Sequence, residues 1–307
     1  MNKERIKIVE VGPRDGLQNE TIKIATNEKI NFINRLSDTG LKHIEVSSFV
    51  NPKYIPQLAD ATEVFKSIKR NPNIKYSALV PNEQGLLRAL DSKPNSIAVF
   101  TAVSETFCKK NINCTIEESL HRFEPILKLA EENNIPVRAY ISCVLGCPYE
   151  GYIQPEKVSE ISQKLISMGC CEISLGDTIG AGTPLQARTM LRHVSDYVSM
   201  DKLAVHFHDT RGQALANIHA CLDLGIRTVD SSVAGLGGCP YAEGATGNVA
   251  TEDVVYMLHG MGYSTGIDLG KIIHVGQSIS AQLNRSNNSR VGSAGVPYDY
   301  KNYQIAQ

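Results

Sequence analysis

The alternation of short apolar runs with amphipathic stretches is the feature that most limits how this chain can fold. Eight runs rich in β-branched residues recur along it, and helix-like stretches separate them. In residues 27–40, for example, Ile30, Ile33 and Leu36 share one face, and residues 117–134 have a similar helical pattern. The predicted strands are 6–11, 43–48, 76–80, 96–102, 137–143, 172–177, 203–208 and 228–233.

Strands that are apolar on both faces and alternate with helices predict a parallel sheet covered by helices. Eight such units form a (β/α)8 TIM barrel, an α/β fold of about 250 residues. The alternative is a doubly wound open sheet, which usually carries a G-x-G-x-x-G turn after its first strand; the segment GPRDGLQ lacks this spacing. We predict one barrel domain at 1–285, with an extra C-terminal helix at 269–283, and a loosely ordered polar tail at 286–307.

The charge balance excludes two classes of partner. The 31 Lys and Arg residues are matched by 32 Asp and Glu residues, so no basic excess is available for nucleic acid or for a membrane surface. No apolar run approaches the roughly 20 residues of a membrane helix, and no signal-peptide pattern precedes the first strand.

The eight cysteines lack zinc-ribbon spacing. We therefore expect a cytoplasmic protein with reduced core thiols.

Two histidines stand at the end of the seventh predicted strand. His206 and His208 are two residues apart, so both imidazoles point to the same side, and we expect that side to be the barrel axis. Asp15 follows the first strand, which lies beside the last strands once a barrel closes. The three residues predict a metal site. The alternatives are two core histidines bonded to neighbours, and a plain ion pair between Asp15 and Arg14.

The chemistry of these donors favours one group of ions. Imidazoles with a carboxylate and no thiolate favour Mg²⁺ or Mn²⁺ over structural zinc, with catalytic Zn²⁺ or Co²⁺ as alternatives. Arg14 offers a fixed cation for a carboxylate or an enolate oxygen. Glu45 and Asp177 lie on the second and sixth predicted strands and project toward this mouth, where they either orient ligands and accept protons or have only structural roles.

A glycine-rich segment follows the eighth predicted strand. Residues 235–247 contain five glycines, which is typical of a mobile lid or of close backbone approach to a ligand. Cys239 lies within it, either as an acid, base or nucleophile or as a small side chain chosen for fit. Asn248 comes next, where it either caps the following helix or contributes an amide oxygen to the metal.

Several blocks of the chain resemble the 3-hydroxy-3-methylglutaryl-CoA lyase family. These blocks span nearly the whole predicted barrel, and the glycine segment with its cysteine is the most specific of them. They are GPRDGLQNE, HIEVSSFVNPKYIPQLAD, SLGDTIG, HFHDTRGQALAN, SVAGLGGCPYA and GNVATED. One position departs from the family pattern, because Thr21 follows the QNE triplet where the family has a lysine near the coenzyme A phosphates.

The resemblance implies a TIM barrel that cleaves 3-hydroxy-3-methylglutaryl-CoA to acetoacetate and acetyl-CoA with a divalent cation. It implies cation ligation by Asp15, His206, His208 and Asn248. It implies catalytic roles for Arg14, Asp15, Glu45, Asp177, His206 and Cys239, and substrate contacts by Arg14, Gln18, Ser174 and Asn284, the last on the coenzyme A arm. The small-molecule partner is an acyl-CoA, and the family suggests a homodimer.

Two other functions remain open from the sequence. One is a synthase of the same barrel group that condenses acetyl-CoA with a 2-oxo acid, although such enzymes usually lack GLGGCPY and carry a long extension. The other is an inactive acyl-CoA-binding scaffold that retains the barrel. The presence of Asp15, His206, His208, Cys239 and Asn248 together favours the lyase.

Overall fold

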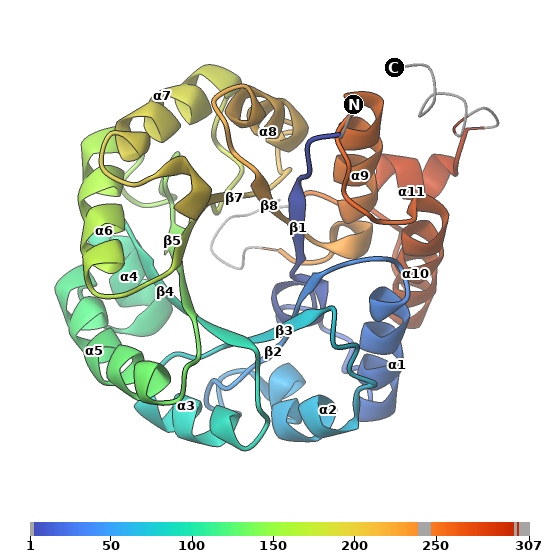
Figure 1. Cartoon of the computed structure of the whole chain (residues 1–307), viewed down its shortest axis with the longest axis horizontal. Helices are drawn as coiled ribbons and strands as arrows, with labels where there is room; N and C mark the ends of the chain where they lie inside the picture. The colour runs from blue at the N-terminus through green and yellow to red at the C-terminus, as the bar shows by residue number, and fades with distance from the viewer. Residues whose placement is uncertain (1–2, 239–246, 298–299, 301–307) are drawn as a thin grey trace.

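The computed structural model describes residues 3–238, 247–297 and 300, and it confirms the TIM barrel (Figure 1). Eight parallel strands close in chain order, and β1 pairs with β8 to complete the ring. Each predicted strand is confirmed, with ends that differ by at most two residues. The strands are β1 (Lys7–Glu10), β2 (His43–Ser48), β3 (Lys75–Leu79), β4 (Ser96–Ala102), β5 (Val137–Ser142), β6 (Glu172–Asp177), β7 (Leu203–Phe207) and β8 (Thr228–Ser231).

Helices surround the barrel and form its outer layer (Figure 1). Those between the strands are α1 (Thr26–Ser37), α2 (Ala61–Ser67), α3 (Glu83–Leu90), α4 (Glu105–Ile112), α5 (Ile116–Glu132), α6 (Pro155–Ser167), α7 (Pro184–Ser195) and α8 (Ala214–Leu222). After β8 come α9 (Thr251–Gly260), α10 (Leu269–Gln282) and α11 (Arg290–Ala294). Short helical turns are η1 (Gly12–Gly16), η2 (Pro56–Leu58), η3 (Met200–Lys202) and η4 (Val233–Gly235).

The period-two alternation of the strands separates two environments. In β5, Ala139 and Ile141 join the apolar core between the barrel and its helices. Arg138 and Tyr140 point the other way, and Arg138 reaches Asp230 of β8 across the barrel interior. The interior is therefore polar beneath the mouth, rather than filled only by aliphatic layers.

The residues after α10 correct one prediction. The predicted helix at 269–283 is confirmed as α10, but residues 286–297 are not the loosely ordered tail that their polar composition predicted. The Asp253 carboxylate accepts hydrogen bonds from Ser289 Oγ at 2.7 Å and from Val291 N at 2.8 Å, and these bonds anchor α11. A single buried carboxylate thus orders a segment with little apolar surface of its own. The rest of the predicted tail, apart from residue 300, lies outside the described residues.

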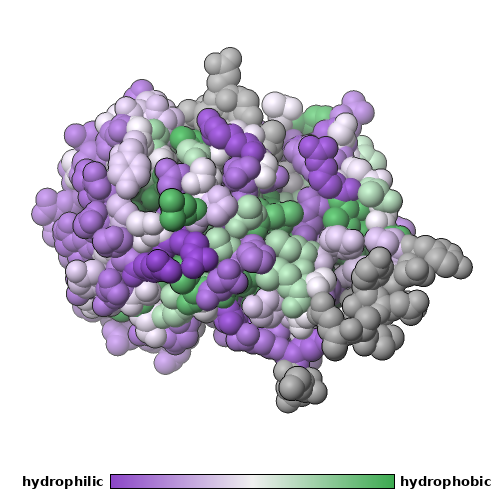
Figure 2. Space-filling model, turned by 90° about the horizontal axis from the view of Figure 1, so that it is seen from above, coloured by the Kyte–Doolittle hydropathy of each residue, from purple (hydrophilic) through white to green (hydrophobic). Residues whose placement is uncertain are grey.

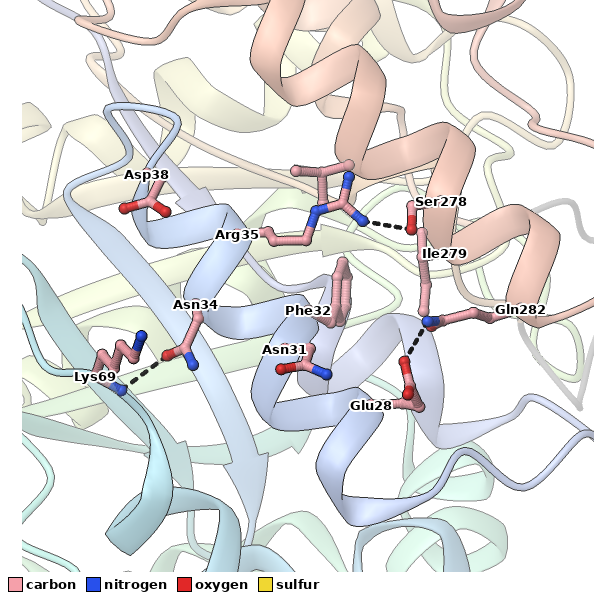
Figure 3. A pocket seen from close by; sticks show the side chains of 11 residues that line it. Glu28, Asn31, Phe32, Asn34, Arg35, Asp38, Lys69, Ser278, Ile279 and Gln282 are labelled. Carbon is pink, nitrogen blue, oxygen red and sulfur yellow. Dashed lines mark hydrogen bonds between the residues drawn. The ribbon is translucent and has the colours of Figure 1, made fainter.

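A groove of about 320 Å³ separates α1 from α10 on the outside of the barrel (Figure 3). Side-chain hydrogen bonds cross it, from Arg35 to Ser278 and from Gln282 to Glu28. None of the residues proposed for catalysis or for metal binding lines it. The groove belongs to the helix layer and not to the barrel mouth.

Hydrophilic side chains cover much of the face in Figure 2, with smaller apolar patches between them. Within the described part of the chain, no helix combines the length and apolar character needed to cross a membrane.

Candidate metal and catalytic site

Asp15, His206 and His208 meet at the C-terminal mouth of the barrel. One ligand atom from each of them lies within 4.8 Å of the other two. Asp15 lies in η1, directly after β1, His206 lies in β7, and His208 follows β7 by one residue. The structure therefore brings together the three residues from which the sequence predicted a metal site.

A tight turn holds Asp15 in this position. The backbone N–H groups of Asp15 and Gly16 both donate to the Val11 carbonyl, at 2.8 and 3.2 Å. Glu10 Oε1 accepts from Gly12 N at 2.8 Å, and a Cβ on Gly12 would lie only 2.5 Å from that oxygen. The Gly-Pro-Arg-Asp-Gly sequence thus directs the Asp15 carboxylate toward the barrel axis because the chain turns within one residue of the strand end.

Asn248 joins the cluster from the far end of the glycine-rich segment. Its Nδ2 donates to Asp15 Oδ2 at 2.7 Å, and its backbone forms an antiparallel bridge with His208. The helix-capping interpretation of Asn248 was wrong, because α9 begins at Thr251 with Ala250 in the N-cap position. Since the Asn248 amide nitrogen is already bonded, its amide oxygen is the atom that can face an ion.

The electrostatics of the cluster suit a cation. Burial alone would raise the pKa of Asp15, but Arg14, His206 and His208 together lower it to about 2. Burial, together with the neighbouring His206, lowers the pKa of His208 to about 4. At neutral pH the site therefore presents an ionised carboxylate and a neutral His208 imidazole, which are the protonation states that bind metals.

A buried atom without a partner supports the same conclusion. Among the described residues, His208 Nδ1 is buried and has no hydrogen-bond partner. An unpaired buried nitrogen normally costs about 1–3 kcal/mol, unless a ligand or water satisfies it. Two imidazoles, one carboxylate and one amide oxygen fit Mg²⁺, Mn²⁺ or a catalytic transition metal. The chain's own residues thus fit a divalent cation.

Arg14 lies beside the cluster and is almost fully buried. Its Nε donates to Glu45 Oε2 at 2.6 Å, and it also forms an ion pair with the Asp15 carboxylate. The Arg14 guanidinium lies 5.2 Å from the centre of the Tyr140 ring, whose hydroxyl donates to Glu45 Oε2 at 3.2 Å. Glu45 Oε1 is buried without a partner among the described residues, and burial raises the pKa of Glu45. Arg14 is thus a fixed cation between two carboxylates.

Asp230 and Arg138 belong to the site, although the sequence analysis did not select them. Asp230 Oδ1 accepts from Arg138 Nη2 at 2.7 Å. Asp230 Oδ2 accepts from Ser174 Oγ at 2.7 Å and lies 3.3 Å from His206 Nδ1. Despite burial, these partners hold the pKa of Asp230 well below its ordinary range. The alternation of β5 and β8 could have placed both side chains inside the barrel, but it does not reveal which residues pair across it.

Asp177 has a different position from the one its strand suggested. Its two carboxylate oxygens accept from Ala181 N at 3.0 Å and Gly182 N at 2.9 Å in the loop after β6. Burial still raises the pKa of Asp177. Asp177 therefore orders this loop at the rim of the mouth and is not one of the residues of the metal cluster.

The remaining predicted substrate residues lie on the rim near η1. Gln18 is half-buried in the loop before α1, and its neighbour Asn19 donates from Nδ2 to Gly238 O at 2.9 Å. Asn284 is exposed and lies just beyond the end of α10, where its backbone takes a left-handed φ of 47°. An ion pair between Arg285 and Glu20 holds this end of α10 against the same loop. Cys239 lies outside the described residues.

Known proteins share this arrangement of fold and motifs. Residues 5–279 match the family described as HMGL-like. The chain belongs to the HMGL-like family. It is 58% identical over 291 residues to the Rattus norvegicus protein named "3-hydroxy-3-methylglutaryl-CoA lyase, cytoplasmic", in a match that covers 95% of this chain and 85% of that protein.

Solved HMGL-like structures have the same barrel. The hydroxymethylglutaryl-CoA lyase of Pseudomonas aeruginosa matches with a TM-score of 0.93 and 52% identity, over 96% of this chain and 98% of that one. An HMG-CoA lyase of Acinetobacter baumannii, solved with coenzyme A and 3-methylmalate, matches with a TM-score of 0.92 and 37% identity, over 96% of both chains. The similarity therefore includes nearly all of the elements that carry the site.

Proposed function

We propose that this protein is a hydroxymethylglutaryl-CoA lyase, which cleaves 3-hydroxy-3-methylglutaryl-CoA to acetoacetate and acetyl-CoA. The observation that carries the proposal is the Asp15, His206 and His208 cluster beside buried Arg14, in a chain 58% identical to a protein of that name. The comparisons do not favour the condensing synthase, since the relatives above are lyases by name. An inactive scaffold would have no need of a buried His208 nitrogen that finds no hydrogen-bond partner in the described part of the chain.

Asp15, His206, His208 and Asn248 would hold the cation, and Mg²⁺ or Mn²⁺ fits these donors. When bound, such an ion polarises substrate oxygens and lowers the pKa of a hydroxyl group. Asp15 contributes an anion that stays ionised, since its pKa of about 2 lies far below neutral pH. Its low basicity suits ligation better than proton transfer.

The cleavage requires a base for the tertiary hydroxyl of the substrate. The O–H electron pair becomes the carbonyl of acetoacetate, and the C2–C3 pair passes to the thioester as an enolate. Of the three candidate carboxylates, Asp177 uses both oxygens to bind backbone N–H groups, and Asp15 is a weak base. Glu45 has a raised pKa and a buried oxygen without a partner, so it is the best proton acceptor among the described residues.

Arg14 supplies the positive charge for the enolate. Because Glu45 and Asp15 fix its guanidinium before substrate binds, little reorganisation is needed as the negative charge develops. Typical preorganised donors of this kind lower the barrier by about 3 kcal/mol. Cys239 returns a proton to the enolate carbon to release acetyl-CoA, because the Nδ1 atom of His206, the alternative donor, faces Asp230 behind the site. Gln18, Ser174 and Asn284 are proposed to contact the acyl-CoA, the last through the coenzyme A arm.

We also infer a homodimer and a cytoplasmic location. The homodimer rests on the family resemblance, and the location rests on the name of the rat relative.

The decisive experiment is to measure acetoacetate release from 3-hydroxy-3-methylglutaryl-CoA by metal-stripped protein, with and without added Mg²⁺ or Mn²⁺. Cation-dependent release is the expected result. If folded protein releases no acetoacetate with any divalent cation, the proposed substrate is wrong, and longer acyl-CoAs and the condensing reaction are tested next.

A further inference from the structure

Asp230 lies directly behind His206, on the side away from the other ligands. It is fully buried on β8 and touches side chains from three other strands. Its Oδ2 lies 3.3 Å from His206 Nδ1, whereas His206 Nε2 lies 3.8 Å from Asp15 Oδ2. The two ring nitrogens of His206 thus face two different carboxylates, one behind the site and one within it.

This arrangement selects one tautomer of His206. An ionised carboxylate only accepts hydrogen bonds, so the nitrogen that faces Asp230 must carry the proton. In the neutral imidazole, the lone pair is then on Nε2, which faces Asp15. That tautomer is the one that a metal-ligating histidine requires, and a carboxylate behind the ring commonly enforces it.

Asp230 is itself held on both oxygens. Arg138 Nη2 donates to Oδ1 and Ser174 Oγ donates to Oδ2, each at 2.7 Å. Arg138 is also fixed by Glu172 Oε1 at 2.8 Å and by the Tyr140 hydroxyl at 3.2 Å. The network joins β5, β6 and β8, so neither the carboxylate nor the imidazole can rotate without breaking buried ionic hydrogen bonds.

His208 has no comparable support. Its Nδ1 is buried without a hydrogen-bond partner among the described residues, although its ring centre lies only 5.5 Å from that of His206. We propose that Asp230, fixed by Arg138 and Ser174, is a positioning residue that presets His206 as the preorganised ligand, whereas His208 becomes oriented only when the ion binds. The inference rests on the metal site of the proposed function and adds a determinant of its affinity.

The test measures Mn²⁺ binding to metal-stripped protein by calorimetry, without substrate. Asp230→Asn replaces two acceptor oxygens by one, so the amide of this variant cannot accept from Arg138 and His206 together. We expect the Mn²⁺ dissociation constant to rise 10- to 100-fold, as for other residues behind metal ligands. The matched control is Asp60→Asn, which also removes a carboxylate from a buried cation, Lys29, but lies outside the site. Its Mn²⁺ affinity should equal that of the wild type.

Equal Mn²⁺ affinity in folded Asp230→Asn and wild-type protein would overturn the inference. Wild-type protein that binds no Mn²⁺ would instead overturn the metal site itself. If Asp230→Asn does not fold, ¹⁵N NMR of the His206 ring in metal-free wild-type protein decides the question. At a pH where the ring is neutral, a proton on Nδ1 supports the role of Asp230, and a proton on Nε2 refutes it.

Discussion

At the scale of single residues, Asp15 connects Arg14 to the other proposed metal-binding residues. Its carboxylate contacts Arg14 on one oxygen and Asn248 on the other, and it faces both histidines. Asp15→Asn keeps the shape but removes the anion, so we expect Mn²⁺ affinity to fall at least about 100-fold and lyase activity to fall with it. Calorimetry and an acetoacetate assay measure the two effects. A variant that retains both properties would rule out Asp15 as a ligand.

Glu45 makes a second prediction at this scale. Burial raises the pKa of Glu45 and Arg14 opposes that rise, so its base form is lost as the pH falls below this raised pKa. The kcat of the wild type should therefore decline on the acid side. Glu45→Gln should lower kcat by about 10²- to 10⁴-fold and remove that decline, with Mn²⁺ affinity nearly unchanged.

The control for the Glu45 prediction removes the hydrogen bond that Tyr140 donates to Glu45. Tyr140→Phe removes the hydroxyl that donates to Glu45 Oε2 and accepts from Arg138 Nη1, and it leaves the carboxylate in place. It should lower kcat far less than Glu45→Gln. Equal losses in both variants would mean that Glu45 acts by holding Tyr140 and Arg14, not as the base.

At the scale of elements, the sequence predicted the strands well and the segments after them less well. Period-two alternation is a local property, so the ends of β5 and β7 were predicted within one residue. The position of Asn248 depends on a different kind of contact. Its segment lies between the ends of β7 and β8, because Val249 N donates to Phe207 O and Ser232 N donates to Val249 O. No local pattern reports such a pairing, and helix capping was therefore an equally good interpretation.

Gly247 allows that segment to reach the site. Its φ is 96°, and a Cβ there would lie 2.0 Å from Gly237 O. Gly247→Ala should therefore displace Asn248 and weaken Mn²⁺ binding by about tenfold or more, with a matching loss of kcat/KM. Gly169→Ala is the matched control, since its φ is 110° but no atom lies within 4 Å of the added Cβ. If both variants bind Mn²⁺ equally well, the close contact at Gly247 does not position Asn248.

At the scale of the whole molecule, the closure of the barrel was predictable and the buried charge network was not. Eight repeated βα units specify the fold, because each unit buries its apolar faces in the same way. The pairing of Arg138 with Asp230 joins residues 92 positions apart across the closed barrel. Similarly, Asp253 anchors α11 through contacts that composition does not encode. Strand ends therefore indicated the proposed ligands, whereas the residues behind them required the three-dimensional structure.

Two buried glutamates predict how the stability of the whole protein depends on pH. Burial raises the pKa of Glu10 to about 7 and that of Glu252 to about 8. Hydrogen bonds from backbone N–H groups oppose the rise, among them Val233 N to Glu10 and Ala234 N to Glu252. Between about pH 5 and these raised pKa values, both glutamates therefore keep their protons in the folded state, whereas they have lost them in the unfolded state. Since the folded state binds more protons, the free energy of unfolding must decrease as the pH rises toward 8.

The window from pH 6.5 to 8 isolates this effect. Histidines with lowered pKa values, such as His43 at about 4, make stability rise with pH, but only below about pH 6.5. Urea unfolding should therefore show a loss on the order of 2 kcal/mol between pH 6.5 and 8. Glu252→Gln keeps an acceptor for Ala234 N but cannot ionise, so it should flatten that slope. A wild-type stability that is constant or increases across this window would mean that both glutamates are ionised in the folded protein.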